Sequence, residues 1–296
     1  LEKARETTLA ENNKSHINLY VALGIKSRAC LAEGDWDGAF KAAKRVIDEG
    51  GYAVGTKSDL TGGMNSLDKQ NVMWGAGIQV ADQAGGYAGF FTHMDNKEGA
   101  YAKSAPKLIS KQLYNRISAT DIRRDWWDPS DKESPYVSKK FSFANVASFL
   151  GDYIYMRVEE MYFTAAEAAL RLDDLKSARE LMNTVMAERD PGYSANNRSG
   201  TLLGATTTTW TGSFLENILT HRRIELWGEY GRLFDVRRLG QGIDRRTDDG
   251  FSEECISMMN RRNVNITKAD TYDWVLTIPK AELDANPNIN EEDQNP

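Results

Sequence analysis

Two glutamates in the stretch HRRIELWGEYGRLFDVRRLG, residues 221–240, have the spacing of a catalytic pair. On a helix, Glu225 and Glu229 lie on one face about 6 Å apart, a separation that the two carboxylates of a glycosidase can have. A general acid needs a raised pKa, which burial or a like charge produces. Arg222 and Arg232 fall on the same helical face, and their positive charges lower the pKa of a nearby carboxyl. We therefore predict a cluster of paired ions here and no catalytic residue.

The same stretch is predicted to hold a helix in place. Ser213 is positioned to cap a helix that begins at Phe214. The ions are expected to pair with each other and with nearby helix ends, while the apolar residues pack inward. Those apolar residues are Ile224, Leu226, Trp227 and Phe234. Aspartates are interleaved with the basic residues that follow, which favours a solvated face over a phosphate site. The basic residues are Arg237, Arg238, Arg245 and Arg246.

Residues for metal or covalent chemistry are sparse. The three histidines are His16, His93 and His221, and no two have the close spacing of a metal-binding pair. No nucleophile elbow, Walker loop or dinucleotide-binding glycine pattern occurs. Cys30 lies in an alanine-rich helical run, where a buried thiol is the usual occupant, so we expect no disulfide with Cys255. The sequence predicts no cofactor and no metal site, although carboxylates at 95–106 and 128–136 leave calcium as an alternative.

Aromatic residues in polar, glycine-rich loops are the most informative candidates for binding. Sugar rings have apolar C–H faces, and covering about 100 Å² of such a face contributes at most about 2.5 kcal/mol per aromatic ring. The predicted ligand contacts are Tyr87, Phe90, Phe91, Tyr101, Trp126, Trp127 and Trp210, with Asp95, Asn96 and Lys97 as hydrogen-bonding partners of sugar hydroxyls. Burial in the core is the alternative for each ring. It is favoured for Trp74, which lies in an apolar run, and for Trp227.

The composition narrows the class of protein. With 296 residues, 41% hydrophobic residues and a net charge of -6, the chain can build a globular core. It lacks the basic field of a protein that binds nucleic acid. No apolar run approaches the roughly 18 residues of a membrane span. Residues 1–16 lack the apolar core of a signal peptide, so we expect any export signal to lie upstream.

Two stretches have the pattern of helical hairpins, residues 17–50 and 153–189. An offset of 139 positions places Ala29 on Ala168, Leu31 on Leu170, Asp35 on Asp174, Ala39 on Ala178 and Val46 on Val185. This repeat is of the tetratricopeptide type, with two unrelated amphipathic hairpins as the alternative. We predict a mainly α fold of tetratricopeptide-like hairpins with long irregular loop insertions. The single domain, 1–296, has a ligand-loop insertion at about 52–152 and a helix and tail at 213–296.

Three motifs, in their order along the chain, resemble the SusD/RagB-like family. They are YMRVEEMYFTAAEAALR at 155–171, the stretch at 221–240, and LTIPKAEL at 276–283. In the second motif, residues 222–226, 229–232 and 234–238 are similar to the family's Glu-Arg-Arg-x-Glu-Leu, Glu-Gly-x-Arg and Phe-Asp-Leu-Arg-Arg elements. His221 stands where the family often has Glu, and Tyr230 interrupts the Glu-Gly pair. Family members are usually longer, so the chain resembles their later part.

The resemblance implies a role at the bacterial cell surface. SusD/RagB-like proteins are outer-membrane lipoproteins that capture glycans or other nutrients for a partner SusC-like TonB-dependent transporter. Their ligand-contacting aromatics often come from the region between these two hairpins. We expect non-catalytic binding of an oligosaccharide or other nutrient on the extracellular face, with membrane attachment only through an N-terminal lipid anchor outside this sequence. A tetratricopeptide-type protein-interaction module and, less favoured, a glycoside hydrolase are the alternatives.

Overall fold

The structure is a computed structural model that describes residues 13–79, 89–244, 267–269 and 275–294. The described residues form two compact units, one within Leu1–Leu202 and Thr211–Arg232 and one within Leu203–Trp210 and Leu233–Pro296. Helices make up most of the regular structure, and the described strands are short. The prediction that both units act as a single domain stays a prediction.

Both predicted hairpins are present. The first consists of α1 (Leu19–Glu33) and α2 (Trp36–Glu49), and the second of α7 (Val158–Arg171) and α8 (Leu175–Ala187). Asp35 caps α2 by accepting a hydrogen bond from the backbone of Gly38, and Asp174 caps α8 in the same way. At the preceding position, Gly34 and Asp173 both adopt positive φ, 79° and 63°. The predicted repeat is therefore confirmed in the turns as well as in the helices.

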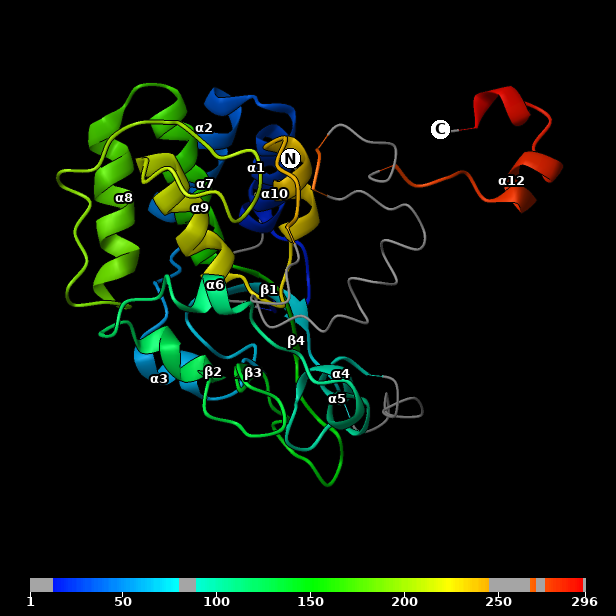
Figure 1. Cartoon of the computed structure of the whole chain (residues 1–296), viewed down its shortest axis with the longest axis horizontal. Coiled ribbons are helices and arrows are strands. Elements are labelled where there is room, and N and C mark those ends of the chain that lie inside the picture. The colour runs from blue at the N-terminus through cyan, green and yellow to red at the C-terminus, as the bar shows by residue number, and fades with distance from the viewer. Residues whose placement is uncertain (1–12, 80–88, 245–266, 270–274, 295–296) are drawn as a thin grey trace. The chain divides into compact units, whose positions relative to one another are not determined.

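The hairpins pack side by side around α7. Helix α2 packs against α1 and α7, and α7 also contacts α8 and α9 (Phe214–Glu225) (Figure 1). Small side chains allow the helices to approach closely, because Ala39, Ala168 and Ala178 are completely buried. Ser213 caps α9 through the backbone of Glu216, as predicted.

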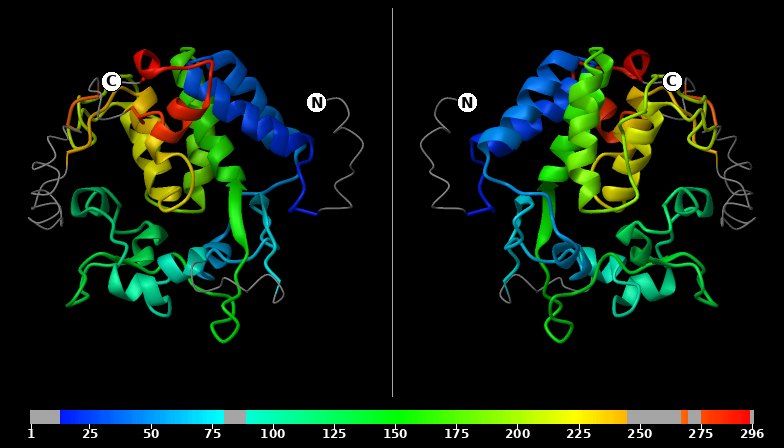
Figure 2. Two further views of the ribbon diagram at one scale, coloured as in Figure 1. Left: turned by 90° about the vertical axis from the view of Figure 1, so that its right-hand side faces the viewer. Right: turned by 90° about the vertical axis from the view of Figure 1, so that its left-hand side faces the viewer.

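The loop insertion lies beside the helices (Figure 2), and most residues of a second core cluster come from it. Its elements are α3 (Lys57–Thr61), β1 (Val72–Ala76), α4 (Phe90–Met94), α5 (Ala100–Ser104), α6 (Lys111–Tyr114), the 3-10 helix η4 (Ile122–Trp126), β2 (Trp127–Asp128) and β3 (Val137–Ser138). Strand β4 (Tyr153–Arg157) pairs antiparallel with β1 and leads directly into α7. This short ribbon joins the insertion to the hairpins. It therefore fixes the insertion against the end of α7.

The second unit contains little regular structure. Its described elements are α10 (Arg232–Arg238, whose first residue belongs to the other unit), α12 (Lys280–Ala285), the 3-10 helix η7 (Glu291–Asp293) and a parallel bridge between Thr206 and Gly242. The predictions for Arg245, Arg246 and Cys255 lie outside the described residues. No helix in the described part of the chain has the length and apolar character needed to cross a membrane.

Candidate ligand-binding site

The chain turns sharply after α9, where the sequence predicted a continuous helix. Helix α9 ends at Glu225, and Gly228 and Gly231 then adopt positive φ, 75° and 105°. A Cβ atom on Gly228 would lie 2.6 Å from the ring of Phe141, so only glycine fits this turn. The prediction that Glu225 and Glu229 share one helical face is therefore wrong, because Glu229 lies on the turn. Phe234, predicted to pack inward, is exposed.

Glu225 lies at the centre of a buried ion network. Its carboxylate accepts hydrogen bonds from Arg123 at 3.1 Å, Arg157 at 2.9 Å and Arg189 at 2.9 Å, and all four side chains are fully buried. Burial alone raises the pKa of a carboxyl, but the guanidiniums of Arg189, Arg157 and Arg123 hold the pKa of Glu225 well below its usual range.

The predicted cluster of paired ions is confirmed, but its predicted partners are wrong. The arginines that bind Glu225 come from η4, from β4 and from the residues after α8, and not from its own helix. A carboxyl with a lowered pKa holds no proton to donate near neutral pH, which argues against Glu225 as a general acid.

Glu229 and Lys140 stabilise the turn that follows α9. Arg157 donates to both oxygens of Glu229 at 2.8 Å, and Lys140 donates to Glu229 and to the backbone oxygens of Glu225 and Trp227. Burial lowers the pKa of Lys140 to about 8, although the negative charge of Glu229 opposes this shift. The turn is therefore held by buried charges.

The lowered pKa of Lys140 predicts a pH dependence of stability. Folded Lys140 loses its proton near pH 8, whereas the unfolded chain keeps it up to the ordinary value of 10.5. The unfolded state binds more protons in this window, so the contribution of Lys140 to the free energy of unfolding rises with pH by at most about 1.4 kcal/mol per pH unit. Chemical denaturation measures the free energy of unfolding of the wild-type protein and of Lys140→Met. The wild-type value minus the variant value should rise as the pH increases above 8. A constant difference would contradict the assignment.

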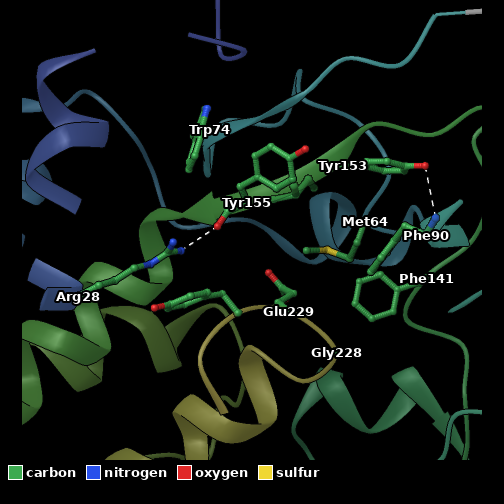
Figure 3. Close-up of a pocket in the computed structure, with 11 residues that line it drawn as sticks. Arg28, Met64, Trp74, Phe90, Phe141, Tyr153, Tyr155, Gly228 and Glu229 are labelled. Carbon is green, nitrogen blue, oxygen red and sulfur yellow. Dashed lines mark hydrogen bonds between the residues drawn. The ribbon is translucent and has the colours of Figure 1, made fainter. Parts of the chain in front are cut away.

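An aromatic cleft with a volume of about 480 Å³ opens in front of this turn. Its lining lies entirely within the unit that contains both hairpins, called the hairpin unit below. The lining residues are Arg28, Met64, Trp74, Phe90, Phe141, Tyr153, Ile154, Tyr155, Gly228, Glu229 and Tyr230. Figure 3 shows Trp74, Tyr153 and Tyr155 along one side, Gly228 and Glu229 along the opposite side, and Met64, Phe90 and Phe141 at one end.

The rings of the cleft contact one another and remain accessible. Trp74 packs edge-on against Tyr155 with ring centroids 5.0 Å apart, and Phe90 contacts Tyr153 at 5.9 Å. Tyr155 is 41% exposed and Tyr230 is 38% exposed, so solvent reaches both rings. The cleft therefore presents preformed flat apolar surfaces to solvent.

Arg28 holds three parts of the cleft together. Its guanidinium donates to both carboxylate oxygens of Glu160, at 2.8 and 2.6 Å, and to the backbone oxygen of Tyr155 at 2.7 Å. The same group lies 3.8 Å from the ring centroid of Tyr230. Arg28 thus links α1, β4 and α7 to the turn that carries Tyr230.

The structure corrects the prediction for three of the aromatic residues. Phe91, Trp126 and Trp127 are 2%, 3% and 1% exposed and belong to the core cluster of the insertion, so they offer no face to a ligand. They are buried because the insertion has to form its own apolar core. Of the predicted rings that the structure describes, Phe90 alone lines the aromatic cleft.

The remaining predicted aromatics lie elsewhere. The ring of Tyr101 stacks on His93 with centroids 4.6 Å apart. Trp210 is half-buried in the second unit, and Tyr87 lies outside the described residues. Ligand contacts for these three rings stay predictions.

Asp95 and Asn96 line a second hollow of about 780 Å³, the loop groove, together with Lys97. Buried Asp95 accepts hydrogen bonds from the backbone of Lys97, Glu98 and Phe143, each at 3.0 Å. Asn96 donates to the backbone oxygen of Ser138 and accepts from the backbone of Lys107, both at 2.8 Å. Both side chains therefore hold loop segments together, and their contact with sugar hydroxyls stays a prediction.

Sequence reasoning missed most of the cleft. Tyr153 and Tyr155 alternate along β4, and residues two apart on a strand point to the same face. That alternation in YIYMR was a signal that these rings lie together. No local signal places Arg28, Trp74 and Tyr230 beside them, because these residues come from α1, β1 and the turn after α9.

In the described segments, no three His, Cys, Asp or Glu side chains form a group that could hold a metal ion. The fold is that of a tetratricopeptide-like helical protein with a long loop insertion. Residues 91–296 match the model of the SusD family, so the chain belongs to that family and the resemblance in its motifs is confirmed. A comparison with curated proteins finds no match.

Several solved structures resemble this chain. A SusD-like carbohydrate binding protein from Bacteroides vulgatus ATCC 8482 is 28% identical, with a TM-score of 0.64 over 81% of this chain and 49% of that chain. A SusD superfamily protein from Bacteroides thetaiotaomicron VPI-5482 is 24% identical, with a TM-score of 0.73 over 96% of this chain and 61% of that chain. Surface glycan-binding protein A from Bacteroides uniformis is 18% identical, with a TM-score of 0.61 over 98% of this chain and 64% of that chain. This chain therefore spans about half to two thirds of the length of these structures.

Proposed function

We propose that this chain binds an oligosaccharide in the aromatic cleft and catalyses no reaction on it. The observation that carries the proposal is the presence of two partly exposed tyrosines, Tyr155 and Tyr230, in one cleft with Trp74 and Phe90. Flat rings cover the apolar faces of sugars, and the tyrosine hydroxyls can pair with hydroxyl groups at the sugar edge. The carbohydrate-binding relative from Bacteroides vulgatus supports the same ligand class.

The expected affinity is modest. Each ring that covers a sugar face contributes at most about 2.5 kcal/mol, and part of that is offset by the ordering of the ligand. Two or three rings therefore suit capture and release better than permanent binding. This energetic range fits a protein that passes its ligand on.

The charged groups beside the cleft support binding without catalysis. Burial raises the pKa of Glu229, but Arg157 and Lys140 outweigh burial and lower it. The pKa of Glu225 is lowered too, and its carboxylate is enclosed by three arginines. A pair of glycosidase carboxyls requires one member that is protonated at working pH, and neither glutamate meets that requirement.

Replacing Tyr155 with Ala should weaken oligosaccharide binding at least about tenfold, because about 1.4 kcal/mol of the ring's contribution suffices for that factor. The backbone oxygen that pairs with Arg28 remains in this variant. Isothermal titration against a panel of plant, fungal and host oligosaccharides measures the effect. Phe149→Ala is the matched control, because Phe149 is 49% exposed but does not line the cleft.

Two results would contradict the proposal. One is that no oligosaccharide of the panel binds the wild-type protein. The other is that Tyr155→Ala and Phe149→Ala bind a ligand equally well, which would place the site elsewhere. Binding of a peptide in place of a glycan would favour the protein-interaction module.

Family membership supports the wider setting of this binding. We infer that the full protein is lipid-anchored on the extracellular face of an outer membrane and passes its ligand to a SusC-like TonB-dependent transporter. Co-purification of the full-length protein with such a transporter from outer membranes, by a tag on this chain, tests the partnership. Recovery of the tagged protein without a transporter would contradict it.

A further inference from the structure

Arg28, the cation among the described residues that line the aromatic cleft, is already paired with a carboxylate. Its guanidinium forms a bidentate ion pair with Glu160, which is buried, and the Arg28 side chain itself is only 12% exposed. The ring of Tyr230 covers the guanidinium, and the backbone oxygen of Tyr155 takes a further N–H group. Arg28 is therefore paired inside the protein before any ligand arrives, with a carboxylate that it shares with Arg222.

Glu229, the anion of the lining, is paired in the same way. Both of its oxygens accept from Arg157, and one also accepts from Lys140. Arg157 and Lys140 are both buried. The other residues of the lining that the structure describes carry no charge at neutral pH, since they are aromatic, aliphatic, methionine or glycine.

A ligand that carries an anionic group meets a specific energetic penalty in such a cleft. Where its carboxylate or sulfate faces the rings, the group loses water on an apolar surface and meets no unpaired cation among the described lining residues. Burial of an unpaired charge is strongly unfavourable. A neutral sugar loses much less, because its hydroxyls can stay at the open edge while its C–H faces cover the rings. We propose that the aromatic cleft selects neutral oligosaccharides and excludes those built from uronic acids or bearing sulfate. This inference rests on the proposed function.

Matched pairs of ligands test the selectivity on the wild-type protein. Each neutral oligosaccharide is titrated beside the same backbone oxidised at C6, such as cello-oligosaccharides against cellouronates and mannan oligosaccharides against mannuronates. The neutral member should bind at least about tenfold more tightly. Its affinity should also be insensitive to salt, because no charge pair with the ligand is formed.

The outcomes separate this inference from the proposed function. Equal or tighter binding of the acidic member would overturn the neutral selectivity and leave oligosaccharide binding intact. Binding of neither member by any pair in the panel would overturn both. Tighter binding of the neutral member supports both.

A variant that releases Arg28 gives an independent test. Glu160→Gln removes the balancing charge, while the contacts of Arg28 with Tyr155 and Tyr230 keep it beside the cleft. The acidic member of each pair should then gain about tenfold in affinity, and this gain should disappear in high salt. Circular dichroism confirms that the variant is folded, because Glu160 is buried and also pairs with Arg222 at 3.5 Å. If the variant does not fold, the matched pairs on the wild-type protein decide the question. A folded variant without any gain would contradict the assigned role of Arg28.

Discussion

Replacing Glu225 with Gln is expected to lower the free energy of unfolding of the hairpin unit by about 3 to 5 kcal/mol. The substitution keeps the size of the side chain but leaves the guanidiniums of Arg123, Arg157 and Arg189 around a neutral amide. An amide accepts fewer hydrogen bonds than a carboxylate, and its NH2 group faces donors. Urea denaturation followed by circular dichroism measures the loss.

An exposed ion pair supplies the control for this experiment. Lys44 and Asp48 pair across one turn of α2, and both side chains are well exposed. Asp48→Asn should change the free energy of unfolding by less than about 0.5 kcal/mol, because solvent screens the pair. Similar losses for Glu225→Gln and Asp48→Asn would show that the buried network contributes no more than a surface pair.

The hairpins were predictable because their signals are local. Helical periodicity, an aspartate before α2 and α8, and a turn residue at Gly34 or Asp173 all lie within a few residues of the structure they specify. The partners of Glu225 had no such signal. Arg123 and Arg157 are far from Glu225 in the sequence, and the two glycines of the turn moved Glu229 off the helical face.

The type of candidate site was predictable from the sequence, but the residues that form it were not. The sequence indicated aromatic platforms in the insertion, yet it could not distinguish a ring that packs in a core from one at a cleft. Trp126 and Trp127 follow a charged segment and are nevertheless buried, whereas Trp74 lies in an apolar run and lines the aromatic cleft. Burial depends on which segments meet in space, and neighbours in the sequence report on it only weakly.

Replacing Trp127 with Ala is expected to lower the free energy of unfolding by about 3 to 5 kcal/mol, because a large buried side chain is removed and the space cannot fully close. The ring contacts Trp126 and Trp227 with centroids 5.8 and 5.7 Å away, so its loss affects the insertion core and the residues beside the turn. Thermal and urea denaturation measure the loss. Trp127→Phe is the matched control, since a smaller ring keeps much of the packing and should recover most of the stability.

The same variants test the assignment of Trp127 to the core and of Tyr155 to ligand binding. Under conditions where Trp127→Phe is fully folded, it should bind an oligosaccharide as tightly as the wild-type protein, because Trp127 does not line the aromatic cleft. Tyr155→Ala should show the opposite pattern, with weaker binding and nearly unchanged stability, since its ring is partly exposed. If folded Trp127→Phe instead lost affinity while its stability was unchanged, Trp127 would be a ligand contact and the assignment to the core would fail. Removal of a core ring thus changes the free energy of unfolding, whereas removal of a cleft ring changes the free energy of ligand binding.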